Sequence, residues 1–176
     1  MRIVIRSVVL IQVVLLCAAL SYASPPHRVR VTVERVTDGD TLVVTSENGT
    51  RLRLRLLRIE APEIAHGPLL GQPYGLEARQ YLARLVINRS VEVEMFGPDV
   101  YRRILAVVWA ADTNVNLEMV RSGFAEIYRR ARCRAYCREL FEAEVQAQRG
   151  RAGMWILETH ESPAAYRKRV RASPRG

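Results

Sequence analysis

Two pairs of acidic residues stand where separate parts of one small domain could bring them together. Asp38 and Asp40 flank a glycine at a predicted turn, and Glu60 and Glu63 stand where a predicted strand ends. Carboxylates gathered in one place repel each other unless a cation lies among them, and oxygen ligands without nearby histidine or cysteine favour calcium or magnesium. The alternative is that the Asp-Gly-Asp sequence is only a turn and that the glutamates are solvated.

Two arginines have the chemistry to complement such a carboxylate cluster. Arg55 precedes Glu60 on the same predicted strand, and Arg103 begins a later one. A guanidinium binds phosphate oxygens through paired hydrogen bonds, and fixed cations stabilise the negative charge that develops during phosphodiester hydrolysis. Taken singly, each arginine is better explained as an ordinary surface residue.

The elements that must position these residues begin with a three-stranded meander. Apolar and polar residues alternate over 29–36, a strand resumes over 41–44, and arginine alternates with leucine over 51–59. This period of two residues indicates half-buried strands, and Asn48-Gly49 is typical of a hairpin turn. The first turn of a meander and the end of its third strand can lie at the same edge, which would bring the four carboxylates together.

The rest of the chain alternates helices and strands. The periodicity predicts helices over 74–86, 115–122 and 134–149, and strands over 91–96 and 103–109. Gly123 is well placed to end the second helix. Five strands with a helix between the third and fourth predict an α+β fold, the five-stranded β-barrel of the OB-fold with about three helices. Such a fold does not by itself specify a function.

The N-terminal segment has the features of a secretory signal peptide. Two arginines precede an apolar run from Val8 to Leu20, and small residues on either side of Tyr22 suit cleavage after Ala23. The run is short for a membrane-spanning helix. We therefore expect residues 1–23 to be removed and the protein to be periplasmic or secreted, with an uncleaved membrane anchor as the alternative.

Length and charge limit the class of protein. The chain has 176 residues, of which 27 are basic and 18 acidic, for a formal charge of +9. This length suits one domain, which we place at 29–157 after a linker over 24–28 and before a basic, disordered tail over 158–176. The basic surplus favours polyanionic partners such as nucleic acid, although a solvated cationic surface explains it equally well. No sequence feature indicates a protein partner, so we expect a monomer.

Two cysteines remain after the predicted cleavage, Cys133 and Cys137. Export would place them in an oxidising compartment, where a disulfide can form. A spacing of four residues fits poorly inside a regular helix, so the bond would require a turn or a frayed helix end there. A disulfide and two free thiols both remain open.

Five segments, taken together, resemble the staphylococcal nuclease (thermonuclease) family, in the family's order and at approximately its spacing. They are Val36-Thr-Asp-Gly-Asp-Thr-Leu42, Arg55-Leu-Leu-Arg-Ile-Glu-Ala-Pro-Glu63, Tyr74-Gly-Leu-Glu-Ala78, Asp99-Val-Tyr-Arg-Arg-Ile-Leu-Ala106 and Val115-Asn-Leu-Glu-Met-Val-Arg-Ser-Gly-Phe-Ala125. The resemblance implies an OB-fold and a calcium-dependent endonuclease that hydrolyses DNA and RNA with little sequence specificity and leaves 3′-phosphates. The competing hypothesis is a non-catalytic OB-fold module that binds nucleic acid or another polyanion.

The resemblance also implies a metal site. Asp40 and Glu60 match carboxylate ligands of one calcium ion, the main-chain oxygen of Ala61 matches a carbonyl ligand, and Asp38 matches an acidic neighbour that helps to hold the ion. The family usually has aspartate at the position of Glu60, so one extra methylene must be accommodated, and this could favour another divalent ion.

The catalytic residues follow from the same segments. Glu63 matches the general base for the attacking water, Arg55 and Arg103 match the pair that clamps the phosphate, and Tyr101 matches a tyrosine beside the terminal phosphate of the nucleotide.

Two further positions depart from the family pattern. Arg102 replaces a common glycine, and if that glycine serves a positive-φ turn, the arginine costs of order 1 kcal/mol there and could shift Arg103. Arg129 falls where the family has a tyrosine facing the base, so a cationic phosphate contact could replace base stacking.

Overall fold

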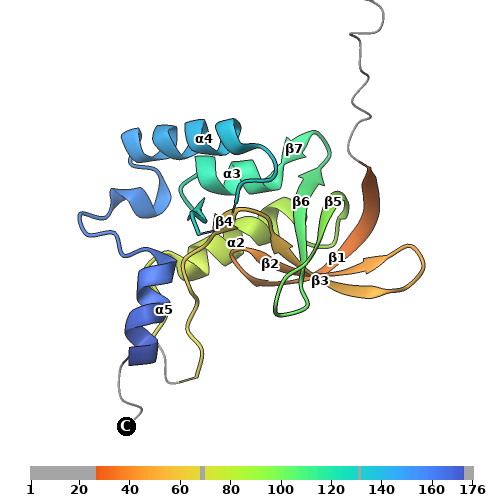
Figure 1. Ribbon diagram of the computed structural model, residues 1–176, viewed down its shortest axis with the longest axis horizontal. Coiled ribbons are helices and arrows are strands. Elements are labelled where there is room, and N and C mark those ends of the chain that lie inside the picture. Colours follow the sequence, from red (N-terminus) through yellow and green to blue (C-terminus); the bar gives the residue numbers. More distant parts are fainter. Residues whose placement is uncertain (1–26, 68–69, 131, 173–176) are drawn as a thin grey trace, which may run out of the picture.

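The computed structural model describes residues 27–67, 70–130 and 132–172, and its strands close into a barrel (Figure 1). One sheet has the strand order β3-β2-β1-β5-β6-β7, and a parallel pairing of β3 with β6 closes it. Its strands are β1 (Arg28–Asp38), β2 (Thr41–Ser46), β3 (Arg51–Leu56), β5 (Ser90–Pro98), β6 (Ile104–Ala110) and β7 (Thr113–Asn114). The predicted OB-fold barrel is confirmed, with β7 as an additional edge strand.

Strands β1, β2 and β3 form the predicted antiparallel meander. Val36 pairs with Leu42, which pairs in turn with Leu54, and all three side chains are buried. Directly paired residues point to the same face of a sheet, so this row of apolar side chains fills the barrel interior. Because the side-chain period is two, Arg51, Arg53 and Arg55 stand on the outer face of β3.

The predicted third strand is interrupted, which corrects its expected end at residue 59. It stops at Leu56, Arg58 has a positive φ of 68°, and the chain then forms the short strand β4 (Ile59–Glu60). Strand β4 pairs antiparallel with β8 (Glu126–Ile127), and Glu60 lies opposite Glu126. The turn at Arg58 therefore directs the acidic segment away from the barrel wall toward a second, two-stranded sheet.

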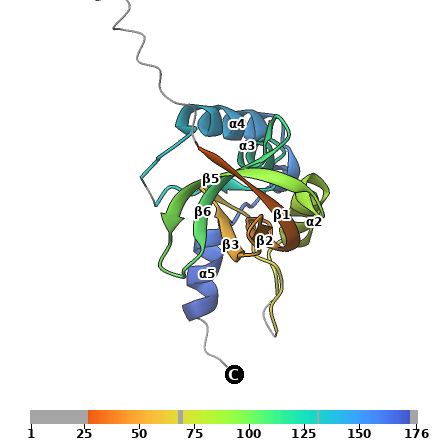
Figure 2. The ribbon, with the colours of Figure 1, turned by 90° about the vertical axis from the view of Figure 1, so that its right-hand side faces the viewer.

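The described residues also form four α-helices and one 3₁₀ helix. They are α2 (Gly75–Val86), α3 (Val115–Arg121), α4 (Cys137–Arg149), η1 (Gly153–Ile156) and α5 (Pro163–Ala172). Helix α3 contacts β6 and α4, and the α3–α4 pair lies on one side of the barrel with α5 on another (Figures 1 and 2). Gly123, with a φ of 71°, ends α3 as predicted. Within the described ranges, every helix is too short or too polar to cross a membrane.

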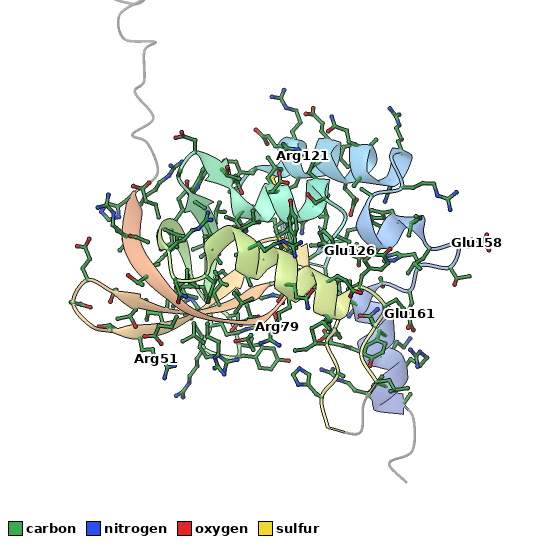
Figure 3. The ribbon with its side chains drawn as sticks, turned by 180° about the vertical axis from the view of Figure 1, so that it is seen from behind. Arg51, Arg79, Arg121, Glu126, Glu158 and Glu161 are labelled. Atoms are coloured by element: carbon green, nitrogen blue, oxygen red, sulfur yellow. A yellow bond between two sulfur atoms is a disulfide. The ribbon has the colours of Figure 1, made fainter. Side chains whose placement is uncertain are left out.

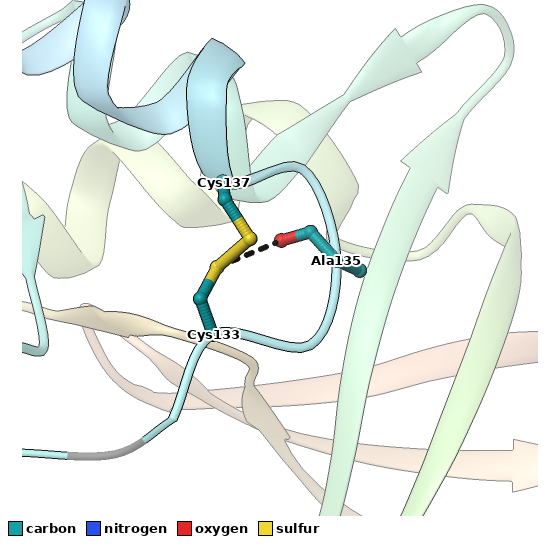
Figure 4. The surroundings of a disulfide bond; sticks show 3 residues. All are labelled: Cys133, Ala135 and Cys137. Atoms are coloured by element: carbon teal, nitrogen blue, oxygen red, sulfur yellow. Dashed lines mark hydrogen bonds between the residues drawn. A yellow bond between two sulfur atoms is a disulfide. The ribbon is translucent and has the colours of Figure 1, made fainter.

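The disulfide between Cys133 and Cys137 is formed, with the two Cα atoms 6.0 Å apart (Figure 4). Helix α4 begins at Cys137 and not at residue 134 as predicted, because Tyr136 adopts a left-handed conformation with a φ of 52°. Cys133 thus lies in a turn before the helix, which is the condition that the spacing of four residues required.

The basic C-terminal segment was expected to be a disordered tail over 158–176, and this prediction is wrong for most of the segment. Residues 163–172 form α5, with Pro163 and Tyr166 buried. The Tyr166 hydroxyl donates a hydrogen bond to the carbonyl oxygen of Leu70, in the loop before α2. Pro163 and Tyr166 thus dock a helix whose remaining residues are partly or fully exposed. The predicted signal peptide, residues 1–23, and residues 24–26 of the predicted linker lie outside the described residues.

Candidate active site

The Asp-Gly-Asp turn lies under helix α2. An added Cβ at Gly39 would lie 2.5 Å from Cβ of Ala61 and 2.9 Å from Cβ of Ala78 in α2. A larger residue would therefore not fit between the two aspartates. Asp38 Oδ1 accepts a hydrogen bond from the backbone N–H of Asp40 at 3.0 Å, which stabilises the turn.

Asp40 joins the two acidic segments. Its side chain is almost completely buried, and its Oδ2 accepts a hydrogen bond from the backbone N–H of Ala61 at 2.9 Å. Ala61 directly follows Glu60, which is also buried, with 2% of its surface exposed. The expectation that the first turn and the end of the third strand meet is therefore confirmed for Asp40 and the Glu60-Ala61 segment.

The backbone of Glu63 is fixed by Gln72 and by the start of α2. Gln72 Oε1 accepts from the backbone N–H of Glu63 at 2.9 Å, and the backbone N–H of Gln72 donates to the carbonyl oxygen of Glu63 at 2.8 Å. Gly75 lies so close that an added Cβ would be 2.4 Å from that same carbonyl oxygen. The Glu63 side chain keeps 29% of its surface exposed, so solvent reaches it. Gln72 received no role from the sequence analysis, since its contact with Glu63 depends on how the loop folds back.

Arg55 reaches the acidic cluster from β3. Its Nη1 forms an ion pair with Asp40 Oδ1, and its Nη2 donates to the carbonyl oxygen of Ile59 at 3.3 Å. Burial lowers the pKa of Arg55 to about 10, and the positive charge of Arg103 acts in the same direction. Arg55 therefore remains charged at neutral pH and lies close enough to Arg103 for the two charges to interact.

Asp99 holds Arg103. Its Oδ2 accepts from Nε and Nη2 of Arg103 at 2.8 and 2.7 Å, and its Oδ1 accepts from the backbone N–H groups of Tyr101 and Arg103 at 2.9 Å each. Burial would raise the pKa of Asp99, but these hydrogen bonds and the charge of Arg103 outweigh burial and lower it. Arg102 has a φ of 60°, which confirms that the position takes the left-handed conformation that glycine commonly serves.

Tyr101 is placed on the surface beside this arginine. Two thirds of its surface is exposed, and the guanidinium carbon of Arg103 lies 5.4 Å from its ring centroid. The ring therefore lies open to solvent beside the Arg103 guanidinium.

Helix α5 supplies a further arginine, which the sequence analysis did not assign to the site. Arg167 Nη1 donates to Glu63 Oε1 at 2.5 Å, and Nη2 donates to Glu60 Oε1. Burial alone would lower the pKa of Arg167, but the hydrogen bonds to Glu63 and Glu60 outweigh it and raise the pKa. No short sequence motif indicates this contact, because α5 is more than a hundred residues away from β4 along the chain.

Asp38 completes the acidic end of the barrel. Burial raises the pKa of Asp38, although the charge of Arg55 and a hydrogen bond from Thr41 act in the opposite direction. This end of the barrel therefore contains four carboxylates, from Asp38, Asp40, Glu60 and Glu63, and three guanidinium groups, from Arg55, Arg103 and Arg167.

The oxygen atoms at this end of the barrel are of the chemical type that binds a divalent cation. The carboxylates and the Ala61 carbonyl are all oxygen ligands, which calcium and magnesium prefer. Asp40 and Glu60 are buried, and buried carboxylates need a positive partner. Among residues 27–67, 70–130 and 132–172, no three acidic, histidine or cysteine side chains already converge as a metal site. Asp40 instead contacts Arg55, while Glu60 and Glu63 contact Arg167.

Arg129 forms an ion pair with Glu144 of α4. Both of its Nη atoms donate to the carboxylate of Glu144, which is buried in α4, and Glu144 also accepts from the backbone N–H of Ile127 at 2.8 Å. Glu144 thus links α4 to Ile127 of β8 and to Arg129, and the expectation that Arg129 contacts a phosphate stays a prediction. Near it, Glu126 contacts His160 Nε2 at 2.9 Å, which links β8 to the segment before α5.

A closed OB-type barrel with carboxylates and arginines gathered at one end defines a class of protein, the nucleases that hydrolyse phosphodiester bonds. Residues 53–157 match the family model described as staphylococcal nuclease homologue, and the chain belongs to that family. By this relationship it is an endonuclease, a hydrolase of phosphodiester bonds.

Curated relatives agree with this assignment. The chain is 35% identical over 158 residues to Endonuclease Htp3 of Saprolegnia parasitica, covering 78% of this chain and 74% of that protein. It is 30% identical over 165 residues to an uncharacterised endonuclease of Haemophilus influenzae, with 93% and 86% covered. It is 35% identical over 145 residues to a micrococcal nuclease of Shigella flexneri, with 77% and 79% covered.

Proposed function

We propose that this nuclease requires a divalent cation, calcium before others, and cleaves DNA and RNA with little sequence preference, leaving 3′-phosphates. The observation that carries the proposal is the hydrogen bond from Ala61 N–H to Asp40, which brings the Asp-Gly-Asp turn to the Glu60 segment beside Arg55. Family membership and the micrococcal nuclease relative support the same activity.

In this proposal Asp40 and Glu60 hold the cation, with Asp38 beside them and the carbonyl oxygen of Ala61 as a further ligand. When bound, such a cation polarises a phosphate oxygen and favours attack by water. Burial of Asp40 and Glu60 suits them to this role, since a carboxylate in a site of low dielectric interacts more strongly with a cation than one in water.

Glu63 is the proposed general base. Its backbone is fixed by Gln72, while its carboxylate remains in reach of solvent. A positioned base of this kind contributes typically about 10²- to 10⁴-fold to the rate, provided that it lies within hydrogen-bond reach of the attacking water.

Arg55 and Arg103 are the proposed phosphate clamp, and Tyr101 the proposed substrate contact. Arg103 uses Nε and Nη2 for Asp99, so its Nη1 can donate to a phosphate oxygen without loss of the ion pair. Fixed guanidinium groups stabilise the transition-state charge without reorganising when it develops, and removing one such donor costs about 10²- to 10³-fold in other hydrolases.

Export is part of the proposal. The disulfide between Cys133 and Cys137 is compatible with an oxidising compartment, and the N-terminal sequence has the pattern of a cleaved signal. The N-terminus of the mature protein, determined by mass spectrometry, tests cleavage after Ala23 against an uncleaved anchor.

The activity test compares the protein with Glu63→Gln and Arg103→Ala on single-stranded DNA and on RNA. We expect cleavage with calcium, none with chelator, and losses of at least about 10²-fold in both variants. Arg121→Ala removes an exposed arginine of α3 and serves as the control, with unchanged activity. The products should become substrates for a phosphatase acting on 3′-phosphates. Binding without cleavage under every cation would favour the non-catalytic binding module instead.

A further inference from the structure

Helix α5 places the guanidinium of Arg167 against two carboxylates of the proposed mechanism, the cation ligand Glu60 and the general base Glu63. Arg167 donates one hydrogen bond to Glu63 and one to Glu60 from its two terminal nitrogens. Glu60 has only 3% of its side chain exposed, whereas Arg167 has 32%. The guanidinium therefore enters the site from the solvent side and covers the buried carboxylate.

The attachment of α5 to the rest of the molecule is light. Tyr166 and Pro163 are its only buried residues among those described, and the Arg169–Glu161 pair beside them is exposed. Figure 3 shows Glu161 at the end of α5 that faces the barrel. Between the helix and the loop after Glu63 lies a solvent-open pocket of about 180 Å³, lined partly by Ile64 and Val170. A segment with so few buried apolar contacts can open at low free-energy cost.

A guanidinium and a divalent cation compete for one carboxylate, that of Glu60. Arg167 already contacts Oε1 of Glu60, so a cation bound to this carboxylate would lie a few ångströms from the guanidinium, and two positive charges at that separation repel strongly where water is partly excluded. A buried carboxylate without any partner is unfavourable, so Glu60 is stabilised by whichever of the two is bound. Arg167 and the cation are therefore alternative partners of one site.

We propose that Arg167 is an internal competitor for the cation and sets the cation concentration that the enzyme requires. The proposal rests on the proposed function, because it assigns the cation to Asp40 and Glu60. Cation binding then displaces Arg167 and loosens α5, and docking of α5 weakens cation binding by the same factor. Loss of Arg167 should raise cation affinity, since the apparent dissociation constant is the intrinsic one divided by the fraction of molecules with the carboxylates free.

The test measures calcium binding by calorimetry, without nucleic acid, on the protein expressed from the full sequence. Arg167→Gln should bind calcium about ten-fold more tightly, the factor expected if the ion pair is formed in about nine molecules of ten. Lys168→Gln is the matched control, because it removes the same charge from the next, exposed residue of α5; its affinity should stay within about two-fold of the unmodified protein. Arg167→Lys keeps the charge but loses the fork, and should fall between them.

A second readout follows α5 itself. Calcium should speed amide hydrogen exchange in residues 163–172 of the unmodified protein, and should change it little in Arg167→Gln, where the helix is already released from the carboxylates. Equal calcium affinity in Arg167→Gln and the unmodified protein, or unchanged exchange in α5, would overturn the competition while leaving the nuclease assignment intact. Calcium binding by none of the variants would instead remove the cation site on which both proposals rest.

Discussion

Asp99 organises the turn before β6 with its two carboxylate oxygens. One oxygen accepts from two backbone N–H groups and the other from the guanidinium of Arg103. Arg102 takes a left-handed conformation in this turn, which for a residue with a side chain costs about 1–2 kcal/mol. The hydrogen bonds to Asp99 stabilise the turn against that cost and keep Arg103 at the barrel end.

A pH series on Asp99→Asn tests this arrangement. The pKa of Asp99 is lowered in the folded protein, so its carboxylate adds stability that is complete above the ordinary aspartate pKa of about 3.9 and is lost as the pH falls through the lowered value. We expect the free energy of unfolding of the variant to be about 1–3 kcal/mol lower than that of the unmodified protein at pH 7. This difference should shrink below about pH 4. Urea denaturation at each pH measures the free energy of unfolding of both proteins.

Asp112→Asn is the control for that series, because Asp112 is exposed on the turn after β6. It should show little difference from the unmodified protein at any pH. A difference for Asp99→Asn that stays constant from neutral to strongly acidic pH would contradict the role given to the ionised carboxylate.

At the scale of elements, the site depends on the close approach of helix α2 to the first turn. Gly39 lies between Ala61 and Ala78 with no room for a side chain, and Gly75 packs on the backbone of Glu63. Two glycines therefore allow one helix to press on both acidic segments at once. The positions of Asp40 and Glu63 follow from this packing as much as from the strands that carry them.

Gly39→Ala should accordingly disturb both stability and activity. The added methyl group would overlap Cβ of Ala61 and of Ala78, and overpacking of this kind costs about 1–3 kcal/mol. We expect lower stability in urea denaturation and a loss of nuclease activity, because the turn can accept the methyl group only by moving Asp38 and Asp40.

Gly150→Ala provides the comparison, since its added Cβ would come no closer than 3.3 Å to another atom and the residue has an ordinary helical φ of −79°. Its stability should change by less than about 1 kcal/mol. Equal stability of the two variants would show that the turn under α2 has more room than the packing indicates.

At the scale of the whole molecule, the sequence carries a net charge of +9. Some of its arginines lie on the outer surface of the barrel, next to the site. Arg35 of β1 and Arg53 of β3 lie on either side of Val43 in one cross-strand row, and Arg53 stands two residues from Arg55 on the same face. Among the described residues Arg53 has no ion-pair partner, so it is available to a phosphate of a strand that extends from the site.

Arg53→Gln should weaken binding of single-stranded DNA at low salt. Each phosphate contact of a single strand contributes a slope of about −0.7 in log affinity against log salt, so the variant should show a slope smaller in magnitude by about 0.7. The measurement uses fluorescence anisotropy in chelator, where cleavage is not expected. Arg138→Gln, an exposed arginine of α4 on the far side from β3 (Figures 1 and 2), should leave the slope unchanged.

The sequence by itself determined the elements and most of the residues at the barrel end. Alternation over 29–36 and 51–56, the turns at Gly39 and Gly49, and the helix stop at Gly123 are local signals, because side-chain period and backbone φ act over a few residues. The five motifs matched Asp40, Glu60, Glu63, Arg55 and Arg103 to site positions of one family. The catalytic roles of these residues stay predictions.

Only the tertiary structure decided which groups these residues meet. Arg167 reaches Glu60 across a separation of 107 residues, and Gln72 reaches the carbonyl oxygen of Glu161 across 89. The segment from residue 158 was predicted to be disordered because its end is rich in arginine and lacks an apolar face, yet the burial of Pro163 and Tyr166 and the hydrogen bonds of Arg167 dock it. Periodicity shows which face of an element is apolar, but it carries no information on the distant segment that packs there.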